Sequence, residues 1–486
     1  MPNHVQLRRL PLRIKPDARR VLSRFFWADD EKARRRITRV MTLPDDVVEN
    51  IVLELLNQYV VDHYDIAATW LEHFHRVEAL IPAECNGLSP TRQMLIGAYF
   101  TMDYAIEAAA LFNPSIVQAL DQHGVPPGAT RFAMSLRAVG EGHISSITMR
   151  YGMVDSRNNI TLTEPPLIRS ALTPEVDPEF STTMVRQTLR DLGALGRIED
   201  LVLGRAGDTA TPAEIRGLLE NVRSEAYSPA QWQRARDNLL SFMESNYSFK
   251  VPEGADLSEM VLFPVSQNDS RGIEDLRLVR FTDDDGSVVV FGTYSAFNGF
   301  TVFPTMLVLR DPKRLQSHTM SGRYARNKGM AIFPRKIRGR YVMSGRLDGE
   351  NLFILESDNL LVWNEARMSQ QPTSWWQFSA IGNCGSPVET EEGWLMLTHG
   401  IGPMRQYCIG AVLLDLDDPA RVIGELEEPL ISPAEDERVG YVPNVVYTCG
   451  CMLHNGCLII PYAVSDIITK FALVDLEELL SALRRH

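Results

Sequence analysis

Gly272-Ile-Glu-Asp-Leu-Arg277, followed by Gly292-Thr-Tyr-Ser-Ala-Phe-Asn-Gly299, is the most informative part of this 486-residue sequence. The first segment sets two carboxylates and a guanidinium beside a glycine. The second ends the apolar run Val288–Tyr294 in an Asn-Gly pair, the usual sequence of a tight hairpin turn. Strand patterns flank both segments, so polar groups are presented at strand ends, where rigid scaffolds commonly place binding chemistry.

Short apolar runs dominate the chain from Val261 onward, with Gly, Asn and Asp turns between many of them. They lie at Val288–Tyr294, Thr305–Leu309, Met330–Phe333, Tyr341–Ser344, Leu352–Ser357, Trp394–Thr398, Gly410–Leu416 and Leu458–Tyr462. Upstream, Arg131–Arg137 and Ile144–Arg150 predict two adjacent strands. Strands at this spacing are typical of a sandwich, a barrel or a propeller, and their periodicity does not choose among the three.

Two other segments carry helical patterns. From Asp45 to about Ala110 apolar residues recur at helical spacing, and Ser89 followed by Pro90 predicts a capped helix start. Residues 181–245 return to a helical pattern. We therefore expect a mainly β protein with an N-terminal helical region and a helical insertion.

The composition excludes several classes of function. A net charge of −13 disfavours a general nucleic-acid or anionic-membrane surface, although it permits a local basic pocket. No run of about 18 apolar residues suggests a membrane helix, and the arginine-rich N-terminus lacks the apolar core of a secretory signal. Six irregularly spaced cysteines indicate a reduced, cytoplasmic protein, and Cys449-Gly-Cys451 fits no usual zinc spacing. Walker A, HExxH, GxSxG and EF-hand motifs are missing from the sequence, so we expect no metal and no cofactor.

The two opening segments resemble the signature of glycoside hydrolase family 130, the β-mannoside phosphorylases and β-mannosidases. That family typically has Gly-x-Glu-Asp-Pro-Arg and then Tyr-Thr-Ala-Tyr-Asp-Gly; here Leu276 replaces the proline and Asn298 replaces the aspartate that serves as the acid. The resemblance covers roughly residues 111–470. It implies a five-bladed β-propeller with the active site at its central channel. The expected division is a helical appendage at 1–105 and a propeller at 106–486, interrupted by a helical insertion at about 181–245.

The resemblance also implies roles for individual residues. Those that match sugar-binding positions are Asn113, Ser115, Arg137 and Asp466. Beside them, we expect Asp275 to accept a hydrogen bond from a sugar hydroxyl group. Those that match phosphate-binding positions are Lys328, Arg346, His399 and Tyr407. The segment after Asn327 departs from the family at Gly329 and Arg335, where acids are usual. If the cationic side chains converge they form an anion site suited to phosphate, and the alternative is that each is a solvated charge at a strand end.

The acid is the open question. An asparagine at 298 cannot donate and regain a proton, and its Asn-Gly pair could simply be a hairpin turn. The nearest carboxylates downstream of Arg346 are Asp348 and Glu350, which are candidates for the acid unless they form a solvated turn. Glu274 and Asp275 are adjacent, and neighbours on a strand point to opposite faces, so we expect Asp275 to face the channel and Glu274 to be structural.

The leading interpretation is an inverting glycoside phosphorylase that cleaves β-mannosides with inorganic phosphate as co-substrate, or runs in reverse. The closest alternative is an inverting β-mannosidase, of β-1,2-mannoside type, that uses water; a third is a catalytically weakened carbohydrate-binding propeller. From the aromatic cluster Trp375, Trp376 and Phe378, one ring could stack on an acceptor sugar. We expect a homo-oligomer, a dimer, because the amphipathic helices of residues 45–110 offer apolar surface for a second subunit.

Overall fold

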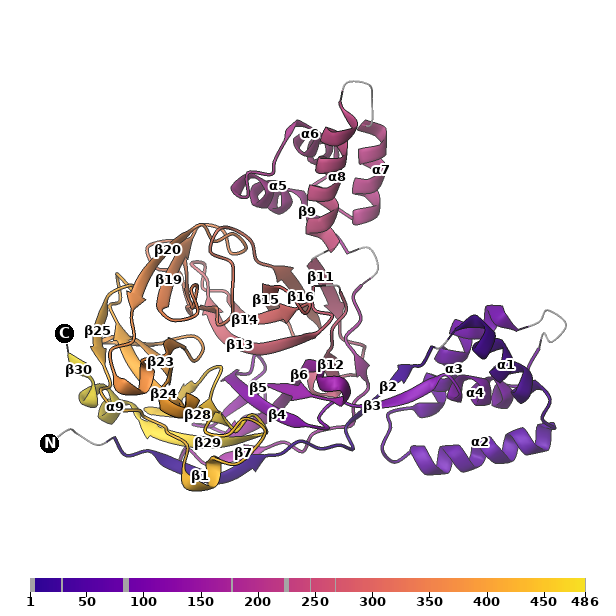
Figure 1. Ribbon diagram of the computed structural model, residues 1–486, viewed down its shortest axis with the longest axis horizontal. Helices are drawn as coiled ribbons and strands as arrows, with labels where there is room; N and C mark the ends of the chain where they lie inside the picture. Colours follow the sequence, from indigo (N-terminus) through magenta and orange to yellow (C-terminus); the bar gives the residue numbers. More distant parts are fainter. Residues whose placement is uncertain are drawn as a thin grey trace.

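The computed structural model of the chain describes residues 5–27, 29–81, 87–175, 178–222, 227–244, 246–266 and 268–485. Within these ranges the protein is mainly β, with five sheets of four to six strands and two groups of helices (Figure 1). No described helix is long and apolar enough to cross a membrane.

Each of the five sheets is largely antiparallel, and most of its strands follow one another in the chain. The first has the order β4 (Ala110–Gln118), β5 (Thr130–Val139), β6 (Ser145–Val154), β12 (Met260–Leu262), β8 (Ser170–Ala171), with β7 (Ile160–Leu162) beside β6. The second is β11 (Asn246–Lys250), β16 (Arg314–Thr319), β15 (Val302–Asp311), β14 (Val288–Phe297), β13 (Gly272–Thr282). The third is β17 (Ala331–Ile332), β18 (Tyr341–Gly345), β19 (Leu352–Ser357), β20 (Glu365–Gln370).

The last two sheets each gain one strand from a distant segment, β30 in the fourth and β1 in the fifth. The fourth is β21 (Ala380–Asn383), β23 (Gly393–Ile401), β24 (Tyr407–Leu414), β25 (Val422–Glu425), β30 (Arg484–Arg485), with β22 (Val388–Thr390) beside β23. The fifth is β1 (Arg8–Ile14), β29 (Ile468–Asp475), β28 (Cys457–Val464), β26 (Val446–Tyr447), with β27 (Met452–His454) beside β28. The predicted apolar runs coincide with observed strands, and the predicted pair upstream is β5 and β6.

Separate apolar cores join each sheet to the next. The cores contain, in order, Ile147 with Leu278, Phe291 with Met343, Ile354 with Met396, Leu397 with Ile460, and Phe471 with Met134. The fifth core joins the last sheet to the first, so the contacts between sheets form a closed circuit. Burial of these apolar side chains is the main force that holds the sheets in this order.

The N-terminal helices form one group: α1 (Asp30–Met41), α2 (Asp45–Tyr59), α3 (Ile66–Val77) and α4 (Pro90–Ala98). They share an apolar core and lie beside the ribbon of β2 (Val21–Phe25) and β3 (Thr101–Ala105) (Figure 1). As the sequence predicts, α4 begins at Pro90, and the Ser89 side chain accepts the backbone N–H of Arg92. However, β1 falls inside the range assigned to the helical appendage. It pairs with β29 and therefore belongs with the sheets.

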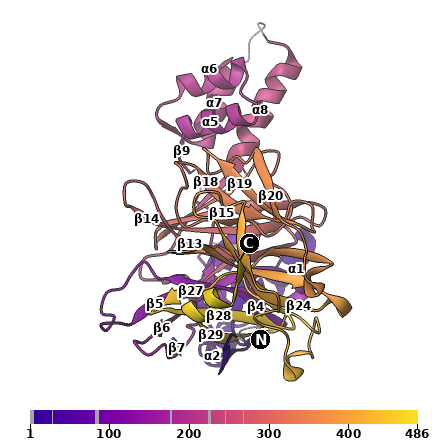
Figure 2. The ribbon, with the colours of Figure 1, turned by 90° about the vertical axis from the view of Figure 1, so that its left-hand side faces the viewer.

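The second helical group lies within residues 181–245, the range that carries the second helical pattern. It comprises α5 (Thr182–Asp191), α6 (Arg197–Arg205), α7 (Pro212–Val222) and α8 (Pro229–Glu244), with a core of its own and a short ribbon of β9 (Phe180–Ser181) and β10 (Thr209–Ala210). Figure 2 shows this group standing on one side of the sheets. A ninth described helix, α9 (Leu476–Ala482), follows β29.

A buried charge cluster fixes the approach of the N-terminal segment to the first sheet. Glu107 is fully buried and accepts from Arg20 Nε at 2.9 Å and from the guanidinium of Arg150 on β6. Removal of one partner from such a cluster leaves an uncompensated buried charge, which is far more costly than the loss of a surface pair.

Candidate active site

A cavity of about 690 Å³ lies where all five sheets converge. Its lining includes Asn113 and Arg137 from the first sheet, Glu274, Asp275 and Arg277 from the second, Lys328 and Arg346 beside the third, Asn383, His399 and Tyr407 from the fourth, and Tyr447 and Asp466 from or next to the fifth. Eight residues that sequence reasoning singled out for the site therefore share one cavity: Asn113, Arg137, Asp275, Lys328, Arg346, His399, Tyr407 and Asp466.

A β-bulge places both carboxylates of the Glu-Asp pair in this cavity. The register of β13 against β14 shifts between Glu274 and Arg277, and Asp275 has a left-handed φ of 57°. Arg137 donates to Glu274 Oε1 at 2.9 Å and to Asp275 Oδ1 at 3.5 Å. The expectation that the two side chains point to opposite faces is therefore wrong, because the bulge interrupts the alternation on which it relies.

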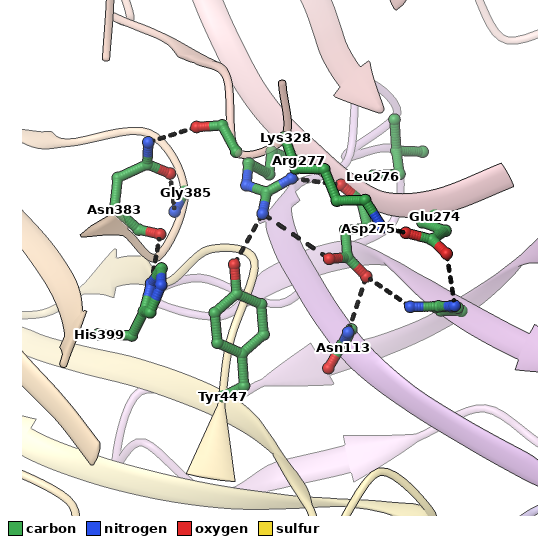
Figure 3. A network of polar contacts seen from close by, with 12 residues as sticks. Asn113, Glu274, Asp275, Leu276, Arg277, Lys328, Asn383, Gly385, His399 and Tyr447 are labelled. Carbon is green, nitrogen blue, oxygen red and sulfur yellow. Dashed lines mark hydrogen bonds and ion pairs between the residues drawn. The ribbon is translucent and has the colours of Figure 1, made fainter. Parts of the chain in front are cut away.

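Asp275 is the centre of a polar network (Figure 3). Asn113 Nδ2 donates to its Oδ1 at 2.7 Å, and Arg277, which also donates to Tyr447 Oη at 2.7 Å, lies 3.9 Å from its Oδ2. Burial alone would raise the pKa of Asp275, but Arg137 and Arg277, together with the Asn113 hydrogen bond, hold it below its usual value. Asp275 is therefore a carboxylate at neutral pH and can accept hydrogen bonds from hydroxyl groups.

Asn113, beside Asp275, has a side-chain oxygen that is free to accept a hydrogen bond. Its Oδ1 is buried and has no hydrogen-bond partner among the described residues, whereas its Nδ2 is held by Asp275. A buried polar atom without a partner costs free energy, so its presence at a cavity indicates a ligand donor that completes it. A hydroxyl group would serve.

Arg346, His399 and Tyr407 form the other end of the site. Arg346 Nη1 lies 3.3 Å from His399 Nε2, and His399 Nδ1 lies 3.1 Å from the carbonyl oxygen of Asn383. Burial and the charge of Arg346 lower the pKa of His399 to about 3, so the ring is neutral and Nδ1–H donates to the carbonyl. The Tyr407 ring stacks on it with centroids 6.0 Å apart.

These contacts change the expected charge of the anion site, which was to come from Lys328, Arg346 and His399 together. His399 contributes no charge, because a protonated ring would be buried beside a guanidinium. Lys328 Nζ forms an ion pair with Glu274, so its charge is offset at the carboxylate end (Figure 3). Arg346 forms no ion pair with a carboxylate anywhere in the described ranges. Its positive charge therefore remains available to an anion.

Ser115 was expected to contact the sugar, and the structure places it elsewhere. Its side chain is fully buried, and its Oγ accepts the backbone N–H of Leu278 at 2.9 Å, tying β4 to β13. Ser115 is not among the described residues that line the cavity. The β4 register shifts between Phe112 and Ser115, which turns Asn113 toward the cavity while Ser115 faces the next strand.

Asn298 was expected at the bottom of the channel, and this location is also wrong. It lies in the turn between β14 and β15, where its Oδ1 accepts the backbone N–H groups of Phe300 at 2.9 Å and Thr301 at 2.8 Å. It is not among the described residues that line the cavity. The hairpin-turn interpretation of the Asn-Gly pair accounts for its position.

Asp348 and Glu350 lie in an exposed turn outside the cavity. Asp348 Oδ1 accepts the backbone N–H groups of Glu350 and Asn351, and Asn351 Nδ2 donates to Oδ2 at 2.7 Å. Partial burial acts to raise the pKa of Asp348, but these hydrogen bonds bring it below its usual value. A proton donor needs the opposite shift, so Asp348 is not suited to be the acid, and Glu350 is exposed outside the cavity.

The sequence analysis assigned no site role to several other lining residues, three of which have buried polar side chains. Arg277, Tyr447 and Asn383 are buried and come from three different sheets. Arg277 lies in the quoted motif, but no local pattern marks Tyr447 or Asn383. The aromatic cluster does not line the cavity: Trp376 is buried in the core, whereas Trp375 and Phe378 are exposed.

The cavity collects backbone conformations that are unusual for residues other than glycine. Lining residues with left-handed φ are Asn113, Asp275, Met404, Arg405, Asn444 and Asp466. Such conformations cost about 1–3 kcal/mol each and persist where surrounding structure enforces them, commonly at functional sites. No group of three or more His, Cys, Asp or Glu residues placed to hold a metal ion occurs in the described part of the chain.

Comparison with known proteins agrees with the motifs. The family model described as β-1,4-mannooligosaccharide phosphorylase matches residues 253–485. A 1,2-β-oligomannan phosphorylase of Thermoanaerobacter sp. (strain X514) is 30% identical over 227 residues, which is 46% of this chain and 75% of that protein. A β-1,2-mannobiose phosphorylase of Listeria innocua is 30% identical over 214 residues, 42% of this chain and 58% of that one.

A solved structure of β-1,2-mannobiose phosphorylase from Listeria innocua in complex with β-1,2-mannobiose aligns with a TM-score of 0.45 and 20% identity. The alignment covers 78% of this chain and 93% of that one. The family assignment rests on the sequence matches, which span the quoted motifs and the C-terminal sheets. The chain belongs to glycoside hydrolase family 130.

Proposed function

We propose that this protein is an inverting glycoside phosphorylase that acts on β-mannosides. The observation that carries the proposal is Arg346, a guanidinium that lines the cavity and has no carboxylate partner among the described residues. Arginine suits bidentate contact with phosphate. The neutral His399 beside it and the Tyr407 hydroxyl leave room for an anion without adding a competing negative charge.

The opposite end of the cavity suits a sugar. Asp275 is an ionised acceptor, Asn113 carries a free carbonyl oxygen, and Arg137 bridges the two acids. A pyranose presents several hydroxyl groups that can donate to such acceptors. With its ring held there, C1 would face the phosphate bound at Arg346, which is the arrangement that an inverting displacement requires.

In the proposed reaction a phosphate oxygen attacks C1 of the mannosyl unit from the face opposite the glycosidic oxygen. The C1–O bond breaks, and the product is α-mannose 1-phosphate. Among the relatives, names specify both β-1,2- and β-1,4-linked substrates, so either linkage is a reasonable first substrate.

The test is product formation with and without phosphate. The purified chain is incubated with β-1,2-mannobiose or β-1,4-mannobiose, and mannose 1-phosphate and mannose are quantified by anion-exchange chromatography. Mannose 1-phosphate formed only in the presence of phosphate supports the proposal. Mannose released at the same rate without phosphate would identify a hydrolase, and binding without either product would identify a carbohydrate-binding protein.

We also propose that the five sheets are the blades of a β-propeller. The support is the closed circuit of cores, in which every sheet packs on the next and the last packs on the first. The helices of α1–α4 and α5–α8, each with its own core, are the proposed appendage and insertion.

Two further proposals concern the assembly and its surroundings. We propose a homodimer through the N-terminal helices, supported by Leu53, Val60 and Val61, apolar side chains that are 59–73% exposed on or just after α2. Light scattering at micromolar concentration tests it. A cytoplasmic location is supported by the five described cysteines, all unpaired; Cys85 lies outside the described residues.

A further inference from the structure

Three carboxylates line the cavity in the described structure, and two of them form ion pairs. Glu274 is paired with Arg137 and Lys328, and Asp275 with Arg137, Arg277 and Asn113. A group that must hand a proton to a departing oxygen cannot be held ionised by cations. These contacts remove Glu274 and Asp275 from consideration as the acid.

Asp466 is the third carboxylate, and its backbone is rigidly positioned. It lies in the turn between β28 and β29, where Ser465 and Asp466 both have left-handed φ values, 51° and 55°. The Ser465 N–H donates to the Val445 carbonyl at 2.8 Å, and Ser465 Oγ donates to the Glu437 carbonyl at 2.7 Å. These bonds, from two other segments, enforce a conformation that two successive non-glycine residues adopt rarely.

The side chain of Asp466 has no partner. It forms no hydrogen bond or ion pair with any described residue, although it is half-buried and lines the cavity. The charged groups that act on it are Asp275 and Glu274, which oppose its ionisation, and Arg137, which favours it. Burial is the largest influence, followed by Asp275, and together they raise the pKa of Asp466 to about 6.

We propose that Asp466 is the catalytic proton donor of this chain and performs the role that Asn298 cannot. The inference rests on the proposed function and names the group that completes it. Asp466 is the one described cavity carboxylate that forms no ion pair. It lies at the Asp275 end, whereas the proposed phosphate site lies at Arg346. Acid and nucleophile then act from opposite sides of C1, as inversion requires.

The proton balance of the step is complete. A hydrogen phosphate dianion attacks C1, the glycosidic bond breaks with its electron pair on the leaving oxygen, and the proton of Asp466 moves to that oxygen. The resulting carboxylate regains a proton from water, and the hydrogen phosphate group of the product releases its proton to water. The net reaction converts a β-mannoside and hydrogen phosphate into a free hydroxyl group and the α-mannose 1-phosphate dianion.

The experiment compares two leaving groups in the Asp466→Asn variant. With β-1,2-mannobiose, whose leaving hydroxyl needs a proton, kcat should fall by about 10²–10⁴-fold. With 2,4-dinitrophenyl β-mannoside, whose leaving group departs as a stable anion, the fall should be less than about tenfold. Asp358→Asn, a matched change at an exposed carboxylate paired with Arg340, should leave both rates unchanged.

Each other outcome overturns the assignment. Equal losses on both substrates would mean that Asp466 only binds the sugar, and a full rate on mannobiose would mean that it has no role in proton transfer. A large loss in Asp348→Asn with Asp466→Asn unimpaired would move the acid to the exposed turn. If the wild-type chain forms no mannose 1-phosphate, both the proposed function and this inference are overturned. If the wild type is active and the Asp466→Asn variant is unimpaired, only the inference is overturned.

Discussion

Replacement of Asp466 by asparagine should stabilise the protein, and the gain should depend on pH. Burial and Asp275 raise the pKa of Asp466 from 3.8 to about 6, so the folded protein binds a proton there more tightly than the unfolded chain does. For an acid with a raised folded-state pKa, stability falls as pH rises through the window between the two values. Below that window the carboxyl group of Asp466 is neutral in the folded protein and does not lower its stability.

The size of the penalty follows from the two pKa values. At pH 8 the difference of about two pKa units corresponds to about 3 kcal/mol of lost stability, and at pH 4.5 the same linkage leaves about 1 kcal/mol. Asparagine resembles the neutral carboxyl in shape and cannot ionise. The variant should therefore be more stable than the wild type by up to about 3 kcal/mol at pH 8, and by about 2 kcal/mol less at pH 4.5.

Denaturant unfolding followed by tryptophan fluorescence at the two pH values measures this difference. Asp358→Asn serves as the control, because its exposed carboxylate carries no burial penalty. An Asp466→Asn variant that is less stable than the wild type at pH 8, or whose effect is identical at both pH values, would refute the reasoning. Either result would mean that Asp466 is ionised at no cost in the folded protein.

Three other changes test separate parts of the structure. Arg346→Ala should weaken phosphate binding by about 10–100-fold in titration calorimetry, which is the scale of a charge-assisted hydrogen bond. Arg367→Ala, a change at an exposed arginine, should not weaken it, and an unchanged affinity in Arg346→Ala would contradict the phosphorylase proposal. Glu107→Gln should cost about 3–5 kcal/mol in chemical unfolding because two buried guanidiniums lose their anion, and a cost below about 1 kcal/mol would contradict the buried cluster. Asn298→Ala should lower the free energy of unfolding by about 1 kcal/mol, because two turn hydrogen bonds are lost. Asn298→Asp keeps these bonds and should leave turnover unchanged, and a clear rise in turnover would place residue 298 in the active site.

Patterns that depend on near neighbours in sequence predicted much of this structure. The Ser89–Pro90 helix start, the alternating strands from Val288 onward and the helical insertion all follow from local propensity and periodicity. Family resemblance supplied Arg137, Arg346 and His399, which the fold does bring to one cavity.

The features that local patterns did not predict depend on irregular backbone conformation and on contacts between residues far apart in the sequence. The bulge at Asp275 reverses the side-chain alternation, and nothing in the residues Glu274-Asp275 announces it. Tyr447 meets Arg277 across 170 positions of sequence, so the contact exists only once the sheets have assembled. Whether Asn298 holds a turn or a sugar could not be decided locally either, because asparagine before glycine suits both.

The pairing of β1 with β29 has a consequence for synthesis of the protein. Arg8 lies opposite Leu473, so β1 must remain without its partner until the ribosome has added the residues of β29, more than 450 positions later. At typical elongation rates of about 5–20 residues per second this interval is roughly 25–90 s. The two helical groups have cores built from consecutive residues and can form during that time. The arginines at positions 8, 9 and 13 of β1 keep the waiting strand charged, which discourages pairing with other nascent chains before the last sheet is complete.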